Sequence, residues 1–113
     1  MTRFRNRSDF LGTYVGRNDG RRARLEIRDT KADSPWPMFH ITFTDLDRDV
    51  TARGLHQERG SEEHVLTDIE LEWQGQSGTK NMKSLHLHTW NTDYLSGISL
   101  WRGREFGMLF ERQ

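Results

Sequence analysis

Two histidines separated by one residue, His86 and His88 in the segment LHLHTW, are the side chains best spaced for metal chemistry in this sequence. Alternate residues of an extended strand point to the same side, so both imidazoles could bind one divalent metal ion with a third ligand from elsewhere. The neighbouring Leu85 and Leu87 favour a different interpretation, in which the leucines face a core and the histidines face solvent. We therefore expect no metal site and no cofactor, and keep a metal at the histidine pair as an alternative.

Catalytic motifs are missing from the sequence. Ser, His and Asp all occur, but no Gly-x-Ser-x-Gly nucleophile elbow is present, and the segment GRNDG matches no phosphate-binding fingerprint. Asp45, Asp47 and Asp49 are spaced like the start of a calcium loop, but the glycine and glutamate that should follow are absent. We expect a solvated turn at these aspartates and predict that the protein is not an enzyme.

Arginine is concentrated near the beginning of the chain, where residues 1–28 hold eight arginines although the whole chain has a net charge of zero. Such a cluster could neutralise the phosphates of a nucleic acid. Binding of single-stranded nucleic acid also needs aromatic side chains on the same exposed protein face as the arginines. Here the face of the candidate β-strand that carries Arg22, Arg24 and Arg28 also carries Glu26. A nucleic-acid-binding module is therefore an alternative that we do not favour.

Composition limits the architecture to a small domain with a thin core. The chain has 113 residues, of which 33% are hydrophobic, and its mean hydropathy is −0.90. It contains no cysteine, and no segment approaches the roughly 20 apolar residues that cross a bilayer. We predict a cytoplasmic protein without a membrane partner, made of a basic N-terminal tail (1–9) and a single β-barrel domain (10–113).

Turn signals recur at the spacing of short antiparallel strands. One of them is Asp19-Gly20, a pair that tolerates the positive φ angles of tight hairpins. Seven such breaks delimit eight candidate strands, at 10–17, 22–29, 38–45, 50–57, 64–74, 84–90, 94–101 and 105–112.

Most of these candidate strands have one apolar side. In the fifth, the residues expected on the inner side are Val65, Thr67, Ile69, Leu71 and Trp73, which alternate with acidic and polar residues. No segment has the pattern of an amphipathic helix, and the short links leave no room for crossover helices, so the strands should be antiparallel. Closing them removes both exposed edges, which predicts an up-and-down β-barrel of about eight strands. The alternative is a two-sheet β-sandwich, with segment 30–37 crossing between the sheets.

Two segments resemble known barrel families. Gly12-Thr13-Tyr14 is similar to the opening of calycin barrels, the lipocalin-like and avidin-like proteins, and this resemblance implies that Arg112 of the last strand covers the Tyr14 ring. The ending SGISLWRGREFGMLF resembles C-terminal hairpins of small, uncharacterised bacterial β-barrel domains. The resemblance implies the fold but predicts no particular ligand, because no set of biotin-contacting residues can be matched.

The interior of an eight-stranded barrel holds either its own side chains or one small ligand. Many bulky residues are expected to point inward, so a filled interior is the first expectation. Mouths of barrels are also common binding sites. A small apolar ligand would then bind near Tyr14, Phe43 and Trp73.

Segment 95–110 is apolar on both faces of its expected strands. If Ile98 and Leu100 fill the barrel, an apolar patch remains on the outer surface, formed by His88, Trp90, Trp101 and Leu109. We predict a homodimer through this patch on the sixth to eighth strands, with the N-terminal tail as an alternative cover. The sequence therefore predicts a non-catalytic binding protein that acts through the barrel mouth or through this outer patch.

Overall fold

The computed structural model describes residues 10–30, 38–57, 65–74, 80–88 and 93–113. It contains eight strands, in chain order β1 (Gly12–Asn18), β2 (Arg21–Asp29), β3 (Met38–Asp45), β4 (Val50–Gln57), β5 (Val65–Gln74), β6 (Lys80–His88), β7 (Tyr94–Trp101) and β8 (Arg104–Arg112). No helix in these described ranges is long and apolar enough to cross a membrane.

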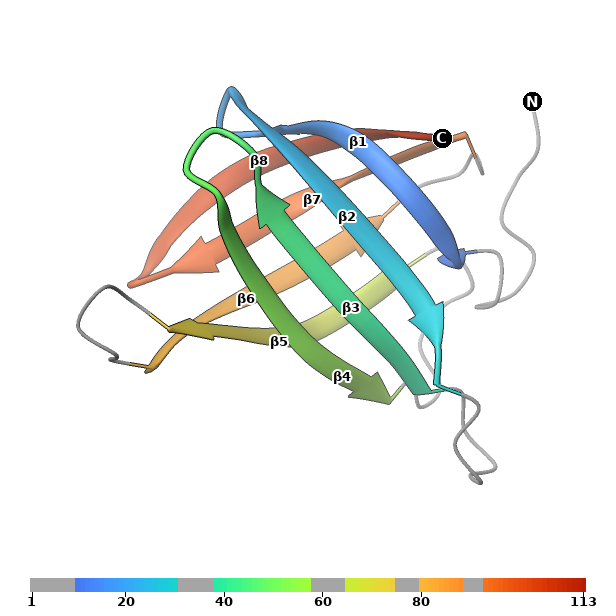
Figure 1. The fold of residues 1–113 in the computed structure, drawn as a ribbon, viewed down its shortest axis with the longest axis horizontal. Helices are drawn as coiled ribbons and strands as arrows, with labels where there is room; N and C mark the ends of the chain where they lie inside the picture. The colour runs from blue at the N-terminus through green and yellow to red at the C-terminus, as the bar shows by residue number, and fades with distance from the viewer. Residues whose placement is uncertain (1–9, 31–37, 58–64, 75–79, 89–92) are drawn as a thin grey trace.

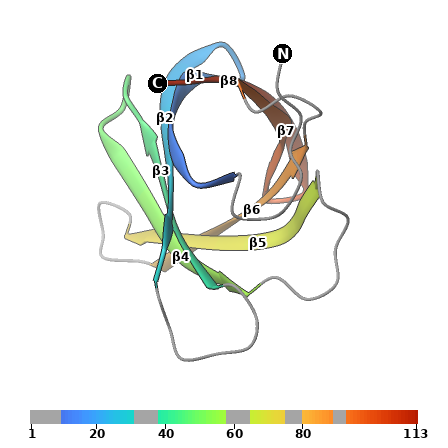
Figure 2. The same ribbon diagram turned by 90° about the vertical axis from the view of Figure 1, so that its right-hand side faces the viewer.

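The strands close into an antiparallel barrel in which each strand pairs with the next and β8 returns to β1 (Figure 1). The closing pairs run from Tyr14 opposite Arg112 to Asn18 opposite Met108. Figure 2 shows the strands encircling the barrel axis. The predicted up-and-down barrel of eight strands is confirmed, and the alternative of two separate sheets is wrong because no edge is left open.

Two tight hairpin turns lie at the same end of the barrel. Asp19 and Gly20 join β1 to β2 with φ angles of 53° and 77°, and Arg102 and Gly103 join β7 to β8 with 52° and 76°. Positive φ at both central residues matches the right-handed twist of the paired strands. The turn from β3 to β4 is at this end too, and we call this end the mouth.

The opposite end is closed by side chains, and we call it the closed end. The Tyr14 hydroxyl donates a hydrogen bond of 2.6 Å to the carbonyl oxygen of Phe10, and both residues are almost fully buried. Arg112 donates to the Tyr14 hydroxyl at 2.8 Å and to the carbonyl oxygen of Leu11 at 2.7 Å. Its guanidinium carbon lies 4.9 Å from the centre of the Tyr14 ring. Arg112 therefore covers the Tyr14 ring, as the resemblance to calycin barrels implied.

Between the two ends, apolar side chains from the inner faces of the strands form a continuous core. Its fully buried members include Leu25, Ile27, Phe39, Ile41, Leu66, Ile69, Leu71, Leu85, Leu87, Leu95 and Phe110. Charged residues occupy the outer faces, as in β2, where Arg24 and Arg28 are exposed.

The orientation of β7 differs from the prediction, which placed Ile98 and Leu100 inside. Leu95 and Ser99 are the fully buried residues of this strand, whereas Ile98 and Leu100 are partly exposed. Gly97 also faces inward, where a Cβ would overlap the carbonyl oxygen of His86 on the neighbouring strand. A residue without a side chain occupies this inner position of β7 because the adjacent backbone lies so close. Both faces carry apolar residues, so alternation alone did not show which one is buried.

The first half of β5 is also reversed relative to the prediction, which placed Val65 and Thr67 on the inner side. Leu66 is buried instead, together with Ile69. The register shifts between these two residues, where Asp68 adopts a φ of 56°. Such a β-bulge adds one residue to the strand and changes which side chains face inward.

Candidate ligand-binding site

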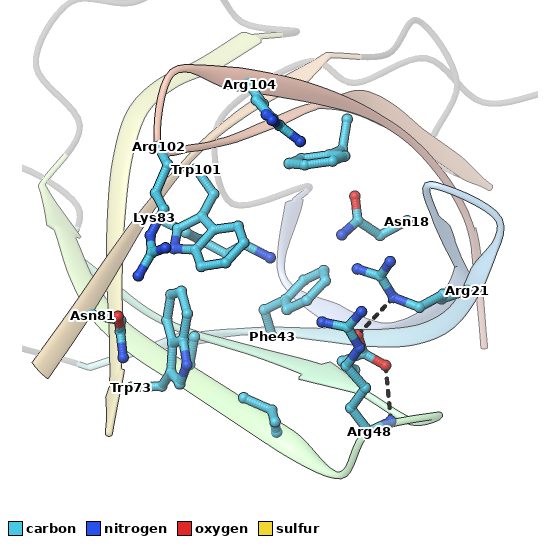
Figure 3. Close-up of a pocket in the computed structure, with 14 residues that line it drawn as sticks. Asn18, Arg21, Phe43, Arg48, Trp73, Asn81, Lys83, Trp101, Arg102 and Arg104 are labelled. Atoms are coloured by element: carbon cyan, nitrogen blue, oxygen red, sulfur yellow. Dashed lines mark hydrogen bonds and ion pairs between the residues drawn. The ribbon is translucent and has the colours of Figure 1, made fainter. Parts of the chain in front are cut away.

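A cavity of about 480 Å³ opens at the mouth of the barrel. Sites for small molecules commonly measure roughly 300 to 1,000 Å³, so this cavity is large enough for one ligand. It is lined by residues at the mouth ends of the strands and in the adjoining turns (Figure 3). Away from this end, bulky side chains of the core fill the interior between the described strands.

Four aromatic residues line the cavity: Phe43, Trp73, Trp101 and Phe106. The rings of Trp73 and Trp101 have their centres 6.0 Å apart with an angle of 51° between their planes. Figure 3 shows these two tryptophans on one side of the cavity and Asn18 and Arg21 on the other. The exposed ring surface gives a flat or apolar ligand a face to stack on.

Cations outnumber acids around the cavity. Its described lining includes one acid, Asp45, whose side chain is 12% exposed and pairs with Arg21 at 3.0 Å. Asp45 also accepts hydrogen bonds of 3.1 Å from the backbone amides of Asp47 and Arg48. This carboxylate therefore neutralises one arginine and holds the turn between β3 and β4.

The remaining positive side chains of the cavity are Arg48, Lys83, Arg102 and Arg104. In the part of the chain that the structure describes, none of these four forms an ion pair. Arg102 is stacked instead on the Trp101 ring, with its guanidinium carbon 4.7 Å from the ring centre. The cavity thus combines aromatic walls with an excess of positive charge.

Lys83 occupies the inner face of β6, opposite the buried Leu71 of β5. Its ammonium nitrogen lies 4.2 Å from the centre of the Phe43 ring and 6.0 Å from that of Trp73. The pKa of Lys83 is lowered from 10.5 to about 8, chiefly by burial of the ammonium group; the charges of Arg21 and Arg48 contribute to this shift and the charge of Asp45 opposes it. The desolvation of the ammonium group dominates this balance.

The residues expected to bind a ligand are divided between the two ends of the barrel. Phe43 and Trp73 line the cavity, whereas Tyr14 is 1% exposed at the closed end and does not. Sequence reasoning did not identify Lys83 and assigned Trp101 to the outer patch, whereas both line the cavity. Both residues lie close to predicted turns at the same end of the barrel. Comparing the residues that flank those turns would have identified them as candidates.

The expected outer patch is only partly present. His88 of β6 and Leu109 of β8 lie in one row of the sheet, linked through Ser96 of β7, and both are exposed. Trp101 was expected beside them, which is wrong, because its ring lies in the cavity against Trp73. The reversed orientation of β7 explains this error. Trp90 lies outside the described residues.

The remaining chemical candidates are the histidine pair of β6 and the outer arginines of β2. Among the described residues, no group of three or more His, Asp or Glu side chains could hold a metal ion. On β2, Arg22 pairs with Asp47 at 2.9 Å, and Arg24 and Arg28 lie 3.5 and 3.6 Å from Glu26. The hydrogen bonds from Arg22 lower the pKa of Asp47. Each outer arginine of β2 thus lies beside a carboxylate of the fold, and Arg24 and Arg28 share one, that of Glu26.

No family model matches the chain, and neither a curated protein nor a solved structure matches it.

Proposed function

We propose that the protein binds a small molecule in the mouth of the barrel, and that this molecule has an aromatic or apolar body and an anionic group. The observation that carries the proposal is the cavity itself, where aromatic rings lie beside cations that have no anionic partner among the described residues. A wholly apolar ligand, as expected from the sequence, would remove these cations from water without compensation. An anionic group would instead form charge-assisted hydrogen bonds with them.

The expected selectivity follows from the energy of such contacts. A hydrogen bond to a charged group contributes about 1.5 to 3 kcal/mol, which corresponds to roughly 10- to 100-fold in affinity. Stacking on Trp73 or Trp101 would depend on the ring system and much less on the charge of the ligand. Anionic and neutral ligands of the same shape should therefore differ strongly in affinity.

Calorimetric titration with para-phenylbenzoate and para-phenylbenzamide tests this proposal, because the two compounds share a shape and differ in charge. We expect the carboxylate to bind at least about tenfold more tightly. Replacing Arg48 of the cavity with Met should weaken binding of the carboxylate and leave the amide unaffected, while the same change at the exposed Arg53 of β4 should affect neither. Equal affinity for both compounds, or binding of neither, would refute the proposal.

A second proposed role is self-association through the outer surface of β1, β7 and β8. Three apolar residues there are unusually exposed, Leu109 at 60%, Tyr94 at 47% and Val15 at 37%. They line a shallow groove to which Arg17 of β1 and Glu111 of β8 also contribute. In a two-fold dimer the same surface meets itself, so Arg17 of one copy can pair with Glu111 of the second. This surface replaces the expected patch that included Trp101.

The contact between Arg112 and Tyr14 supports a relation to calycin barrels, which we retain as part of the proposal.

A further inference from the structure

We propose that Lys83 forms a reversible imine with ligands that carry an aldehyde or ketone group in addition to an anionic group. This inference rests on the proposed function, because it uses the same cavity at the mouth. It adds a covalent step to binding and names carbonyl compounds as the ligand class.

The position of Lys83 favours this reaction. Its side chain extends from the inner face of β6 into the cavity, and its nitrogen faces the rings of Phe43 and Trp73. No carboxylate among the described residues forms an ion pair with it. Asp45, the acid that lines the same cavity, is held by Arg21 and by two backbone amides. The amine therefore faces a space that a ligand can enter.

Only the neutral form of an amine attacks a carbonyl carbon, so the protonation of Lys83 matters. The pKa of Lys83 is about 8, because burial, together with repulsion by Arg21 and Arg48, outweighs the attraction of Asp45. The other charged groups lining the cavity, Arg102 and Arg104, are also positive. With this pKa, roughly a tenth of Lys83 is neutral at pH 7, compared with less than about a thousandth for an ordinary lysine.

The chemistry balances without a further reactant. The neutral nitrogen forms a bond to the carbonyl carbon, and the resulting carbinolamine loses the former carbonyl oxygen as water, together with the two hydrogens of the amine. A carbon–nitrogen double bond replaces the carbon–oxygen double bond, and addition of water reverses the step. The cavity arginines would hold the anionic group of the ligand and keep its carbonyl carbon near the amine.

Reductive trapping with cyanoborohydride tests the proposal, with para-formylbenzoate as the probe. Peptide mapping by mass spectrometry then locates the carboxybenzyl group among Lys31, Lys80, Lys83 and the terminal amine, which are the amines of the chain. We expect one adduct, at Lys83, formed at least about tenfold faster than with the neutral para-formylbenzamide. Its rate should increase about tenfold from pH 6 to 7 and level off above pH 8.

Matched variants separate the reaction from folding. Lys83→Arg keeps the positive charge and should abolish the adduct, and Lys83→Met serves if the arginine variant does not fold. The double variant K31R/K80R should react like the native protein. Adducts spread evenly over all amines, or an unchanged adduct yield in Lys83→Arg, would overturn the proposal.

Calorimetry with para-hydroxymethylbenzoate, which has no carbonyl group to react, distinguishes the two proposals. If this compound binds and the aldehyde is not trapped at Lys83, the covalent step is wrong and the proposed binding function remains. If the compound does not bind and the aldehyde is not trapped, both proposals are wrong.

Discussion

Replacing Lys83 with Met should stabilise the folded protein at neutral pH, although it removes a side chain from the centre of the proposed site. In the unfolded chain the ammonium group is hydrated and its pKa has the usual value of 10.5, whereas in the barrel burial lowers the pKa to about 8. The folded state thus binds this proton less tightly than the unfolded state. Folding at pH 7 must therefore remove a charged group from water, and methionine avoids this cost.

The magnitude follows from the difference between the two pKa values. One unit of difference between the two pKa values corresponds to about 1.36 kcal/mol. The cost of burying the ammonium group therefore has an upper limit of about 3 kcal/mol. Lys83 keeps some contact with water, which screens its charge and reduces this cost. The contact with the Phe43 ring contributes about 0.5 to 1 kcal/mol that the variant loses. We expect a net gain of about 1 kcal/mol in the free energy of unfolding.

Urea denaturation at two pH values provides the assay. Because the pKa is lowered on folding, the cost is fully present below pH 8 and disappears as the pH rises through 10.5. The advantage of Lys83→Met should therefore be present at pH 7 and largely lost by pH 10.5. Arg53→Met, at an exposed position of β4, controls for the loss of a positive charge and should show no such dependence. A variant less stable than the native protein at pH 7, or an advantage that does not change with pH, would refute the reasoning.

Three further predictions concern the closed end, the tight approach of two strands and the outer surface. Tyr14→Phe should lower the free energy of unfolding by about 1 to 2 kcal/mol, because it removes the hydroxyl that bonds to Arg112; urea denaturation with no change would contradict this. Gly97→Ala should cost about 1 to 3 kcal/mol in the same assay, because its Cβ meets the carbonyl oxygen of His86; a neutral effect would show that the strands can separate. Leu109→Lys should convert a dimer into a monomer in sedimentation equilibrium, and a native protein that is already monomeric would exclude the proposed dimer.

The fold could be predicted from the sequence because its signals are local. Asp19-Gly20 identified a hairpin, and three strands, β3, β4 and β7, begin and end at the residues predicted. The apolar residues of β2 all lie on one face in the sequence pattern, and the core contains that face, formed by Ala23, Leu25 and Ile27. Because neighbouring strands are antiparallel and joined by short turns, a closed barrel is the arrangement that leaves no free sheet edge.

Side-chain orientation was harder to predict wherever both faces of a strand are apolar or the register changes. In β7, the buried side includes Gly97 and Ser99, which are less hydrophobic than Ile98 on the other side. Ser99 donates a hydrogen bond of 3.0 Å to the buried Asn18. The inner side is therefore determined by close backbone approach and by a partner 81 residues away, neither of which appears in the local pattern of β7.

The candidate site was only partly predictable for a related reason. Phe43 and Trp73 were identified as aromatic residues on inner faces, and that criterion also selected Tyr14 at the wrong end of the barrel. Depth along the barrel axis depends on the registers between strands, which a single sequence does not contain. Lys83 was missed because the sixth strand was predicted to begin at residue 84, whereas β6 begins at Lys80, so Lys83 was assigned to the preceding turn.

A crystal structure of the protein with para-phenylbenzoate tests the central claim most directly, since it locates both the rings and the charge of the ligand. We predict that the rings lie in the mouth against Trp73 or Trp101 and that the carboxylate lies within ion-pair distance of Lys83 or a cavity arginine. An empty mouth at saturating ligand, or a ligand bound only in the groove on the outer surface, would contradict the claim.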